Sequence, residues 1–168
     1  MDQGSDYSRD AGGAALGARL RRASERMDRD ATRIYATRNM HFEQRWYGIL
    51  NQLVVNGPMS IGAIADALRI THVSVSQASR SLEKAGLVVS QSVPSDARRR
   101  ELALTANGHA LVAELTPLWT AFNDAAAELN AEAGNVVALL DRLDDALDRR
   151  SLFDRIAARA GIATPASD

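Results

Sequence analysis

Residues 60–105 read SIGAIADALRITHVSVSQASRSLEKAGLVVSQSVPSDARRRELALT, and they carry the clearest structural pattern in the chain. Ser60 and Thr71 each precede a short run with helical apolar spacing, and their hydroxyl oxygens are good helix N-caps. Gly86 supplies the left-handed residue at which the second of these helices ends. The stretch therefore predicts two consecutive helices. Their inward residues are Ile61, Ile64, Ala65 and Leu68 in the first and Val75, Ala78 and Leu82 in the second.

A hairpin is expected directly after the helix pair. Its strands are Leu87 to Val93 and Arg100 to Leu104, joined by the turn Pro-Ser-Asp-Ala-Arg-Arg. This places Arg98, Arg99 and Arg100 at the turn, where guanidinium groups can enter a narrow minor groove. Asp96 is placed to hold Arg98 by a bidentate ion pair. The alternative interpretation is a charged turn that serves solubility.

The basic charge of the chain is concentrated in this segment. The 168 residues carry a net charge of −1, which by itself indicates no partner. The segment from Arg69 to Arg100, however, contains six basic residues and two acidic ones. Its net charge is therefore +4, and the remainder of the chain carries −5. A basic segment in an otherwise acidic chain indicates a localised contact with nucleic acid.

Composition excludes several classes of protein. The chain is 46% hydrophobic but only 5% aromatic, and its alanine and leucine favour helix. No apolar window of about 18 residues occurs, so no membrane span is expected. The absence of cysteine excludes disulfides, thiolate metal sites and thiol redox sensing. Residues 1–13 lack the apolar core of a secretory signal and are expected to be a disordered tail of a cytoplasmic protein.

Helical spacing also continues on both sides of the central segment. It predicts helices over 14–38 and 42–55, from Thr105 to a break at Gly134-Asn135, from Val136, and from Ser151 to Ala160. The apolar stripes of the helices at both ends of the chain have too little core within the chain to pack against. We therefore expect a second copy to cover them in a homodimer. The expected fold is mostly α with a small β-wing, namely a winged helix-turn-helix over 42–105 and a helical dimerisation region over 14–41 and 106–160.

The second helix of the pair has an outer face suited to the major groove of DNA. With its apolar residues inward, it leaves Val73, Ser76, Gln77 and Arg80 outward, with His72 and Ser74 at the first turn. Gln77 could pair with adenine, Arg80 with guanine or phosphate, and Val73 could touch a thymine methyl. An ordinary solvated helix face is the alternative.

Two short motifs carry a resemblance to a known family. Leu82-Glu83-Lys84-Ala85-Gly86-Leu87-Val88 and, further on, Asp96-Ala97-Arg98 with Leu104-Thr105 and Gly108 resemble the MarR family of winged-helix transcriptional regulators. The helical pattern is similar from about residue 14 to 150. The resemblance implies an obligate dimer in which the helix after Thr71 reads the major groove. It also implies that Arg98 of the wing, positioned by Asp96, reads the minor groove.

The resemblance further implies double-stranded DNA as the partner, bound at a palindromic operator and usually for repression. A small, often aromatic or anionic effector would release it by binding between the dimerisation and DNA-binding regions. The second hypothesis, from another class, is a winged-helix protein-interaction module without specific operator binding.

The chain departs from the family pattern in ways that limit the analogy. Many members carry a basic residue where this chain has Gln77, so a base preference cannot be transferred. His41, His72 and His109 lie on three different predicted elements, and no metal site or cofactor is expected. No catalytic serine–histidine–aspartate order, phosphate-binding glycine loop or pair of buried carboxylates is discernible, so we do not expect an enzyme.

Aromatic residues gather where the first long helix meets the second. In the family this region borders the ligand pocket, so we interpret the cluster as a candidate pocket. Ordinary core packing of aromatics is an equally open alternative. The candidate residues are Tyr35, His41, Phe42, Trp46 and Tyr47.

Two charged stripes offer a further hypothesis. Five arginines lie three or four residues apart on the helix predicted over 14–38. Four aspartates have a similar spacing on the helix predicted from Val136. We hypothesise that the stripes meet in the dimer; solvated faces with weak local pairs, or arginine contacts to DNA phosphates, are the alternatives. The stripes are Arg19, Arg22, Arg26, Arg29 and Arg33, and Asp141, Asp144, Asp145 and Asp148.

Overall fold

The computed structural model describes residues 6–93 and 96–162, and at Val93 and residues 96–99 it describes the backbone only. The chain divides into two compact units, one ending at Ala113 and one beginning at Glu114. Helix α6 (Ala106–Glu132) contributes to both units. The predicted dimerisation region, 14–41 and 106–160, is therefore distributed over the two.

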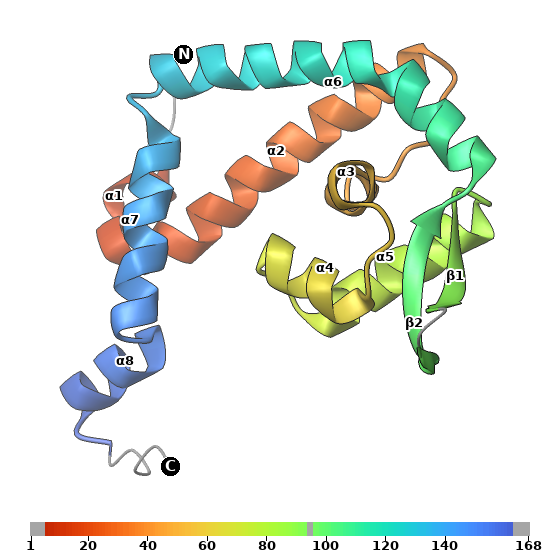
Figure 1. The fold of residues 1–168 in the computed structure, drawn as a ribbon. Coiled ribbons are helices and arrows are strands. Elements are labelled where there is room, and N and C mark those ends of the chain that lie inside the picture. The colour runs from red at the N-terminus through yellow and green to blue at the C-terminus, as the bar shows by residue number, and fades with distance from the viewer. Residues whose placement is uncertain (1–5, 94–95, 163–168) are drawn as a thin grey trace. The chain divides into compact units, whose positions relative to one another are not determined.

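The described elements are mostly helices, with one two-stranded antiparallel sheet (Figure 1). The first unit contains α1 (Tyr7–Asp10), the 3₁₀ helix η1 (Gly12–Ala15), α2 (Leu16–Thr37), α3 (Trp46–Asn56), α4 (Ile61–Leu68), α5 (His72–Lys84), β1 (Val88–Val93), β2 (Asp96–Leu104) and the start of α6. The second contains the rest of α6, then α7 (Val136–Arg149) and α8 (Leu152–Ala160). The predicted mostly α fold with a small β-wing is confirmed.

Helices α3, α4 and α5 surround an apolar core, and capping fixes where α4 and α5 begin. Ser60 Oγ accepts a hydrogen bond from Ala63 N at 3.1 Å, and Thr71 Oγ1 accepts one from Ser74 N at 3.1 Å. Both predicted N-caps are confirmed. The fully buried side chains of this core include Ile49, Leu50, Ile64, Val75 and Leu82.

The wing consists of β1 and β2. Val88 pairs with Leu104, and the antiparallel register continues regularly to Ser92 and Arg100. Met59, outside the hairpin, forms a bridge with β2. Its N donates to Leu102 O at 3.1 Å, and Leu102 N donates to Met59 O at 2.8 Å. The segment between α3 and α4 thus fixes the wing to the helical core.

The turn of the wing differs from the prediction. The second strand was expected to begin at Arg100, but β2 begins at Asp96. The register is also irregular, since Ser92 pairs with Arg100 whereas the next residue, Val93, pairs with Asp96. Ala97, Arg98 and Arg99 therefore lie within β2, between two successive partners of β1. An alternation of apolar and polar residues, which predicts a strand, is missing from residues 96–100. Backbone pairing at Asp96 and Arg100 nevertheless extends the strand over them.

Gly108 allows a close approach between the start of α6 and the segment that joins α5 to β1. Thr105 Oγ1 donates to Gly86 O at 2.7 Å and accepts from Gly108 N at 3.0 Å, which confirms Thr105 as a cap. A Cβ on Gly108 would lie 2.1 Å from the carbonyl oxygen of Leu87. Gly86 itself is left-handed, with φ 71°, and ends α5 as predicted.

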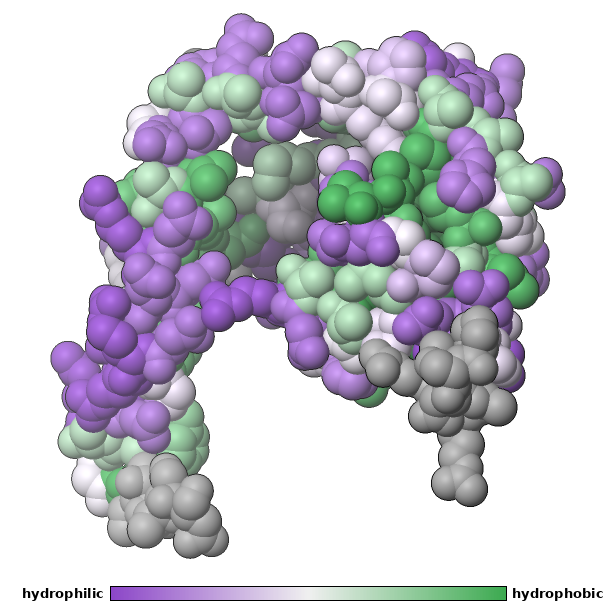
Figure 2. Space-filling model, in the orientation of Figure 1, coloured by the Kyte–Doolittle hydropathy of each residue, from purple (hydrophilic) through white to green (hydrophobic). Residues whose placement is uncertain are grey.

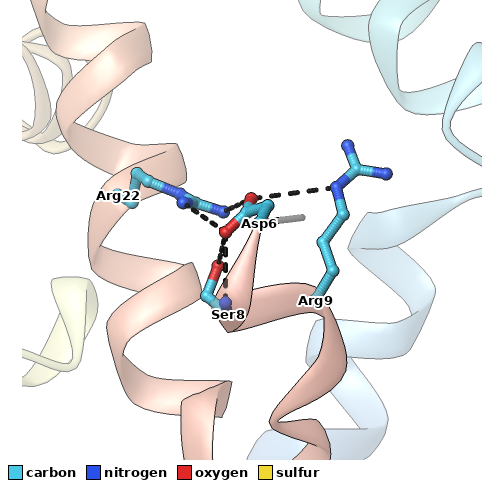
Figure 3. A network of polar contacts seen from close by, with 4 residues as sticks. All are labelled: Asp6, Ser8, Arg9 and Arg22. Atoms are coloured by element: carbon cyan, nitrogen blue, oxygen red, sulfur yellow. Dashed lines mark hydrogen bonds and ion pairs between the residues drawn. The ribbon is translucent and has the colours of Figure 1, made fainter. Parts of the chain in front are cut away.

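The N-terminal segment corrects the prediction of a disordered tail. Residues 7–10 form α1 and residues 12–15 form η1, whereas residues 1–5 lie outside the described residues. Asp6 Oδ2 and Oδ1 accept from Arg22 Nη2 and Nη1 at 2.9 and 3.3 Å, which fastens α1 to α2 (Figure 3). These bonds from Arg22, together with bonds from Ser8, hold the pKa of the Asp6 carboxyl far below its usual range. A partner 16 residues away gives no periodic signal in the sequence.

In the second unit, α6, α7 and α8 are separated by defined breaks. Gly134 and Asn135 have positive φ angles of 83° and 63°, and Ser151 Oγ caps α8 by accepting from Asp154 N at 3.0 Å. The side of α7 shown in Figure 2 is largely hydrophilic. Large apolar side chains are nevertheless exposed on these helices, including Val137, Leu139, Leu147, Leu152, Phe153 and Ile156. Within the described ranges, no helix is long and apolar enough to cross a membrane.

Candidate nucleic-acid interface

Helix α5 presents an apolar face inward and a polar face outward, as the sequence predicts. Val75, Ala78 and Leu82 are at most 3% exposed. On the opposite side Val73 is 63% exposed, and Gln77 and Arg80 are exposed as well. Ser76 is half-buried. The outward row is therefore available to a partner that approaches α5 from outside the core.

Arg80 is the cation of this row. Its Nε donates to the carbonyl oxygen of Ser76 at 3.3 Å, so the side chain lies back along the helix toward Gln77 and Ser76. The guanidinium keeps its remaining donors, which a phosphate or a guanine edge could accept. Lys84, also exposed, adds a second cation one turn further along α5.

His72 and Ser74 have structural contacts at the first turn of α5. Ser74 N donates to the cap Thr71, and the two hydroxyl groups lie 2.9 Å apart. The imidazole of His72 lies against α4, because a Cβ placed on Gly62 would be 3.2 Å from His72 Cε1. Both side chains remain exposed, but these contacts fix how α4 and α5 join. The sequence analysis assigned no role to Gly62.

On the wing, Arg100 is attached to the neighbouring strand. Its Nε donates to Ser90 Oγ at 2.9 Å and its Nη2 donates to Ser90 O at 2.9 Å. The sequence analysis missed Ser90, whose role becomes visible only in the strand register. The side chains of Asp96, Arg98 and Arg99 lie outside the described residues, so the Asp96–Arg98 pair stays a prediction.

Four of the five residues of the candidate pocket come together, and three of them fill the core. The Tyr35 and Phe42 ring centroids are 4.6 Å apart, and Trp46 meets Phe42 edge-on at 5.6 Å. These three side chains are at most 5% exposed. His41 is exposed and lies edge-on to Trp46 at 5.9 Å, while Tyr47 is 40% exposed. This arrangement agrees with core packing of the three buried rings.

Trp46 also takes part in a polar contact that the sequence analysis did not anticipate. Its Nε1 donates to Ser81 Oγ at 3.1 Å, and Ser81 Oγ donates to Glu43 Oε1 at 2.6 Å. Glu43 also accepts from Arg45 Nε at 2.6 Å. The hydrogen bond from Ser81, followed by that from Arg45, lowers the pKa of the Glu43 carboxyl. The segment before α3 is thereby bonded directly to α5.

Comparison with known proteins adds sequence evidence to this geometry. A sequence profile of the MarR family matches residues 42–99, the range that contains α3, α4, α5, β1 and the start of β2. The likeness to the family is thereby located in the helix pair, the helix before it and the first part of the wing. Of the predicted contact residues, Arg100 lies just outside the match and the other nine lie within it.

Solved structures with MarR-like folds cover most of the chain. BpsR of Bordetella bronchiseptica, whose DNA binding is regulated by 6-hydroxynicotinic acid, is 24% identical with a TM-score of 0.63 over 77% of this chain and 93% of its own. NMB1585, a MarR family regulator from Neisseria meningitidis, is 24% identical with a TM-score of 0.57 over 80% and 92%. PcaV of Streptomyces coelicolor, solved with its natural ligand, is 20% identical with a TM-score of 0.62 over 80% and 93%. At these identities the likeness establishes the MarR fold. No curated protein sequence matches the chain.

Proposed function

We propose that this protein is a dimeric transcriptional regulator of the MarR family that binds double-stranded DNA at a palindromic operator. The observation that carries the proposal is the outward row of α5, which is exposed above a buried apolar face and adjoins a wing rich in arginine. Such a helix enters the major groove, where its side chains contact the edges of the bases. The residues proposed to contact DNA are His72, Val73, Ser74, Ser76, Gln77 and Arg80 on α5 and Asp96, Arg98, Arg99 and Arg100 on the wing.

Enrichment of duplexes from a random-sequence pool by the full-length protein tests this proposal. The expected product is an inverted repeat whose half-site centres lie about 10 base pairs apart, one turn of DNA. Recovery of no common sequence would favour the protein-interaction module instead. We use the term selected operator below for the duplex that this experiment yields.

The minor-groove role of Arg98 leads to a quantitative prediction. Arg98→Ala should weaken binding to the selected operator by about 1–3 kcal/mol, because the guanidinium no longer enters the groove. The matched control is Arg100→Ala, which removes the same charge from a side chain already bonded to Ser90. A fluorescence-anisotropy titration should show the smaller loss for the control. Equal losses would mean that Arg98 contributes charge alone.

We propose that the second copy covers the exposed apolar surface of the terminal helices. On α2, Leu16, Met27 and Ile34 are between 41% and 55% exposed. On α8, Leu152 and Phe153 are about 60% exposed. Burial of such surface stabilises association by roughly 25 cal/mol per Å² before the costs of association are subtracted. Dimerisation also supplies the two-fold symmetry that a palindromic operator requires.

The charged stripes are proposed to pair between the two copies. Within its own chain Arg22 bonds Asp6 and Arg33 lies 3.3 Å from Asp30, whereas Arg19, Arg26 and Arg29 have no ion-pair partner among the described side chains. Asp144 and Asp145 are exposed on α7.

Charge reversal tests this pairing. Asp144→Arg with Asp145→Arg should raise the dimer dissociation constant about tenfold, since attraction becomes repulsion. Analytical ultracentrifugation provides the measurement. Asp66→Arg with Glu83→Arg is the control of equal charge on α4 and α5, where both residues are exposed. An unchanged dissociation constant for the α7 variant would refute the pairing.

A small-molecule effector completes the proposed function. BpsR responds to 6-hydroxynicotinic acid, which is both aromatic and anionic. In this chain the proposed site is near Tyr35, His41, Phe42, Trp46 and Tyr47. Titration with aromatic carboxylates should change tryptophan fluorescence and release the selected operator, as repression relieved by an effector requires. An unchanged signal across such compounds would argue against a site beside Trp46.

A further inference from the structure

Glu43 connects the segment between α2 and α3 to the helix proposed to read DNA. Ser81, its hydrogen-bond partner, lies 38 residues away on α5. Glu43 also closes the turn that leads into α3, because its carbonyl oxygen accepts from Trp46 N at 2.8 Å. The side chain of Glu43 is 27% exposed, so it is largely shielded from water.

The direction of each hydrogen bond in this contact follows from chemistry. An indole N–H can only donate, so Ser81 Oγ accepts from Trp46 at 3.1 Å. An ionised carboxylate can only accept, so the single hydroxyl proton of Ser81 points to Glu43. The chain of bonds therefore runs from Trp46 through Ser81 to Glu43. Hydrogen bonds that follow one another in this way strengthen each other, and the last one is charge-assisted.

This contact adds a directional constraint to the apolar packing of α5 against the core. The residues that pack α5 against the core, Val75, Ala78 and Leu82, make apolar contacts, which depend little on orientation. Ser81 follows Arg80 directly and lies one helical turn after Gln77. Since side chains reach about 5–6 Å from a helix axis, a roll of ~10° would move their tips by about 1 Å. A displacement of that size exceeds the ~0.5 Å tolerance of a well-formed binding site.

We propose that Glu43 is a positioning residue for DNA recognition, which sets the roll of α5 through Ser81 and thereby sharpens the choice of base sequence. This inference rests on the proposed function. Glu43 need not touch DNA for this role. Its place beside the aromatic cluster means that a shift of the segment before α3 would reach α5 through one hydrogen-bonded contact.

The test compares affinity for the selected operator with affinity for a scrambled duplex. This ratio is insensitive to the folded fraction of each preparation, because unfolding reduces both affinities equally. Glu43→Ala and Ser81→Ala should each lower the ratio about tenfold, the value of one weakened base contact. The double variant should lose no more than either single one, since both remove the same contact. Glu43→Gln and Ser81→Thr, which keep an acceptor and a hydroxyl, should restore most of the ratio.

The control variant is Glu83→Ala, which removes one negative charge from the exposed side of α5. It should leave the ratio unchanged while raising both affinities slightly. Unchanged ratios for Glu43→Ala and Ser81→Ala, or additive losses in the double variant, would overturn the inference.

A second readout needs no DNA. The chain has two tryptophans, so ¹⁵N-tryptophan labelling gives two indole N–H signals, assigned with Trp46→Phe. Glu43→Ala and Ser81→Ala should shift the Trp46 signal and leave the Trp119 signal in place. If the Trp46 signal does not move, the contact is absent and the inference fails while the proposed function stands. If the signal moves but the wild-type protein selects no duplex, the proposed function fails and the inference with it.

Discussion

Replacing Gln77 and Arg80 together by alanine is expected to weaken binding to the selected operator by about 2–6 kcal/mol, or roughly 30- to 20,000-fold. Each side chain lies on the exposed face of α5, and each good contact to a base edge contributes about 1–3 kcal/mol of discrimination. The scrambled duplex should lose far less, because there Arg80 contributes only its charge. Competition titrations with the two duplexes measure both losses.

Lys84→Ala is the matched control for the Gln77 and Arg80 variant. Lys84 is exposed on the last turn of α5, and we expect it to contact phosphate. Its loss should weaken the selected and scrambled duplexes by similar factors. If the double variant instead lost affinity equally for both duplexes, α5 would not be the element that reads sequence.

Gly108→Ala is expected to lower the free energy of unfolding by about 1–3 kcal/mol. The added Cβ would lie 2.1 Å from the carbonyl oxygen of Leu87, so α6 or the segment that joins α5 to β1 must move. For a chain of this length the melting temperature should fall by roughly 2–12 °C. Thermal unfolding followed by circular dichroism provides the measurement.

Gly17→Ala is the control for this substitution. Gly17 lies in α2, and a Cβ placed there would meet nothing within 4 Å. Alanine at that position should leave stability unchanged or raise it by up to about 1 kcal/mol, because glycine weakens helices. A Gly108 variant as stable as wild type would show that the approach of α6 to Leu87 is loose.

The helix pair could be predicted from the sequence because its signals are local. The side chains of Ser60 and Thr71 each accept from the backbone amide three residues later. Gly86, two residues after the last residue of α5, ends that helix. The buried and exposed faces of α5 also follow directly from a spacing of 3.6 residues. The sequence therefore predicts which face of this helix forms the candidate interface.

Contacts between distant segments could not be predicted in this way. The bond from Ser81 to Glu43 spans 38 residues, and the pair of Arg22 with Asp6 spans 16. The sequence places Arg100 at the turn, as the first residue of the second predicted strand. In the structure Arg100 pairs with Ser92 and its side chain bonds Ser90, and both contacts depend on the strand register, which a single sequence does not specify.

The salt dependence of DNA affinity is the sharpest test of operator recognition by α5 and the wing. Each phosphate contact should add about −0.9 to the slope of log K against log salt concentration. Three basic contacts from each of two protomers would give a slope of roughly −5 for the selected operator. The selected operator should also bind at least about 10³-fold more tightly than a scrambled duplex. A slope near zero, or equal affinity for the two duplexes, would contradict the assignment of α5 and the wing to operator recognition.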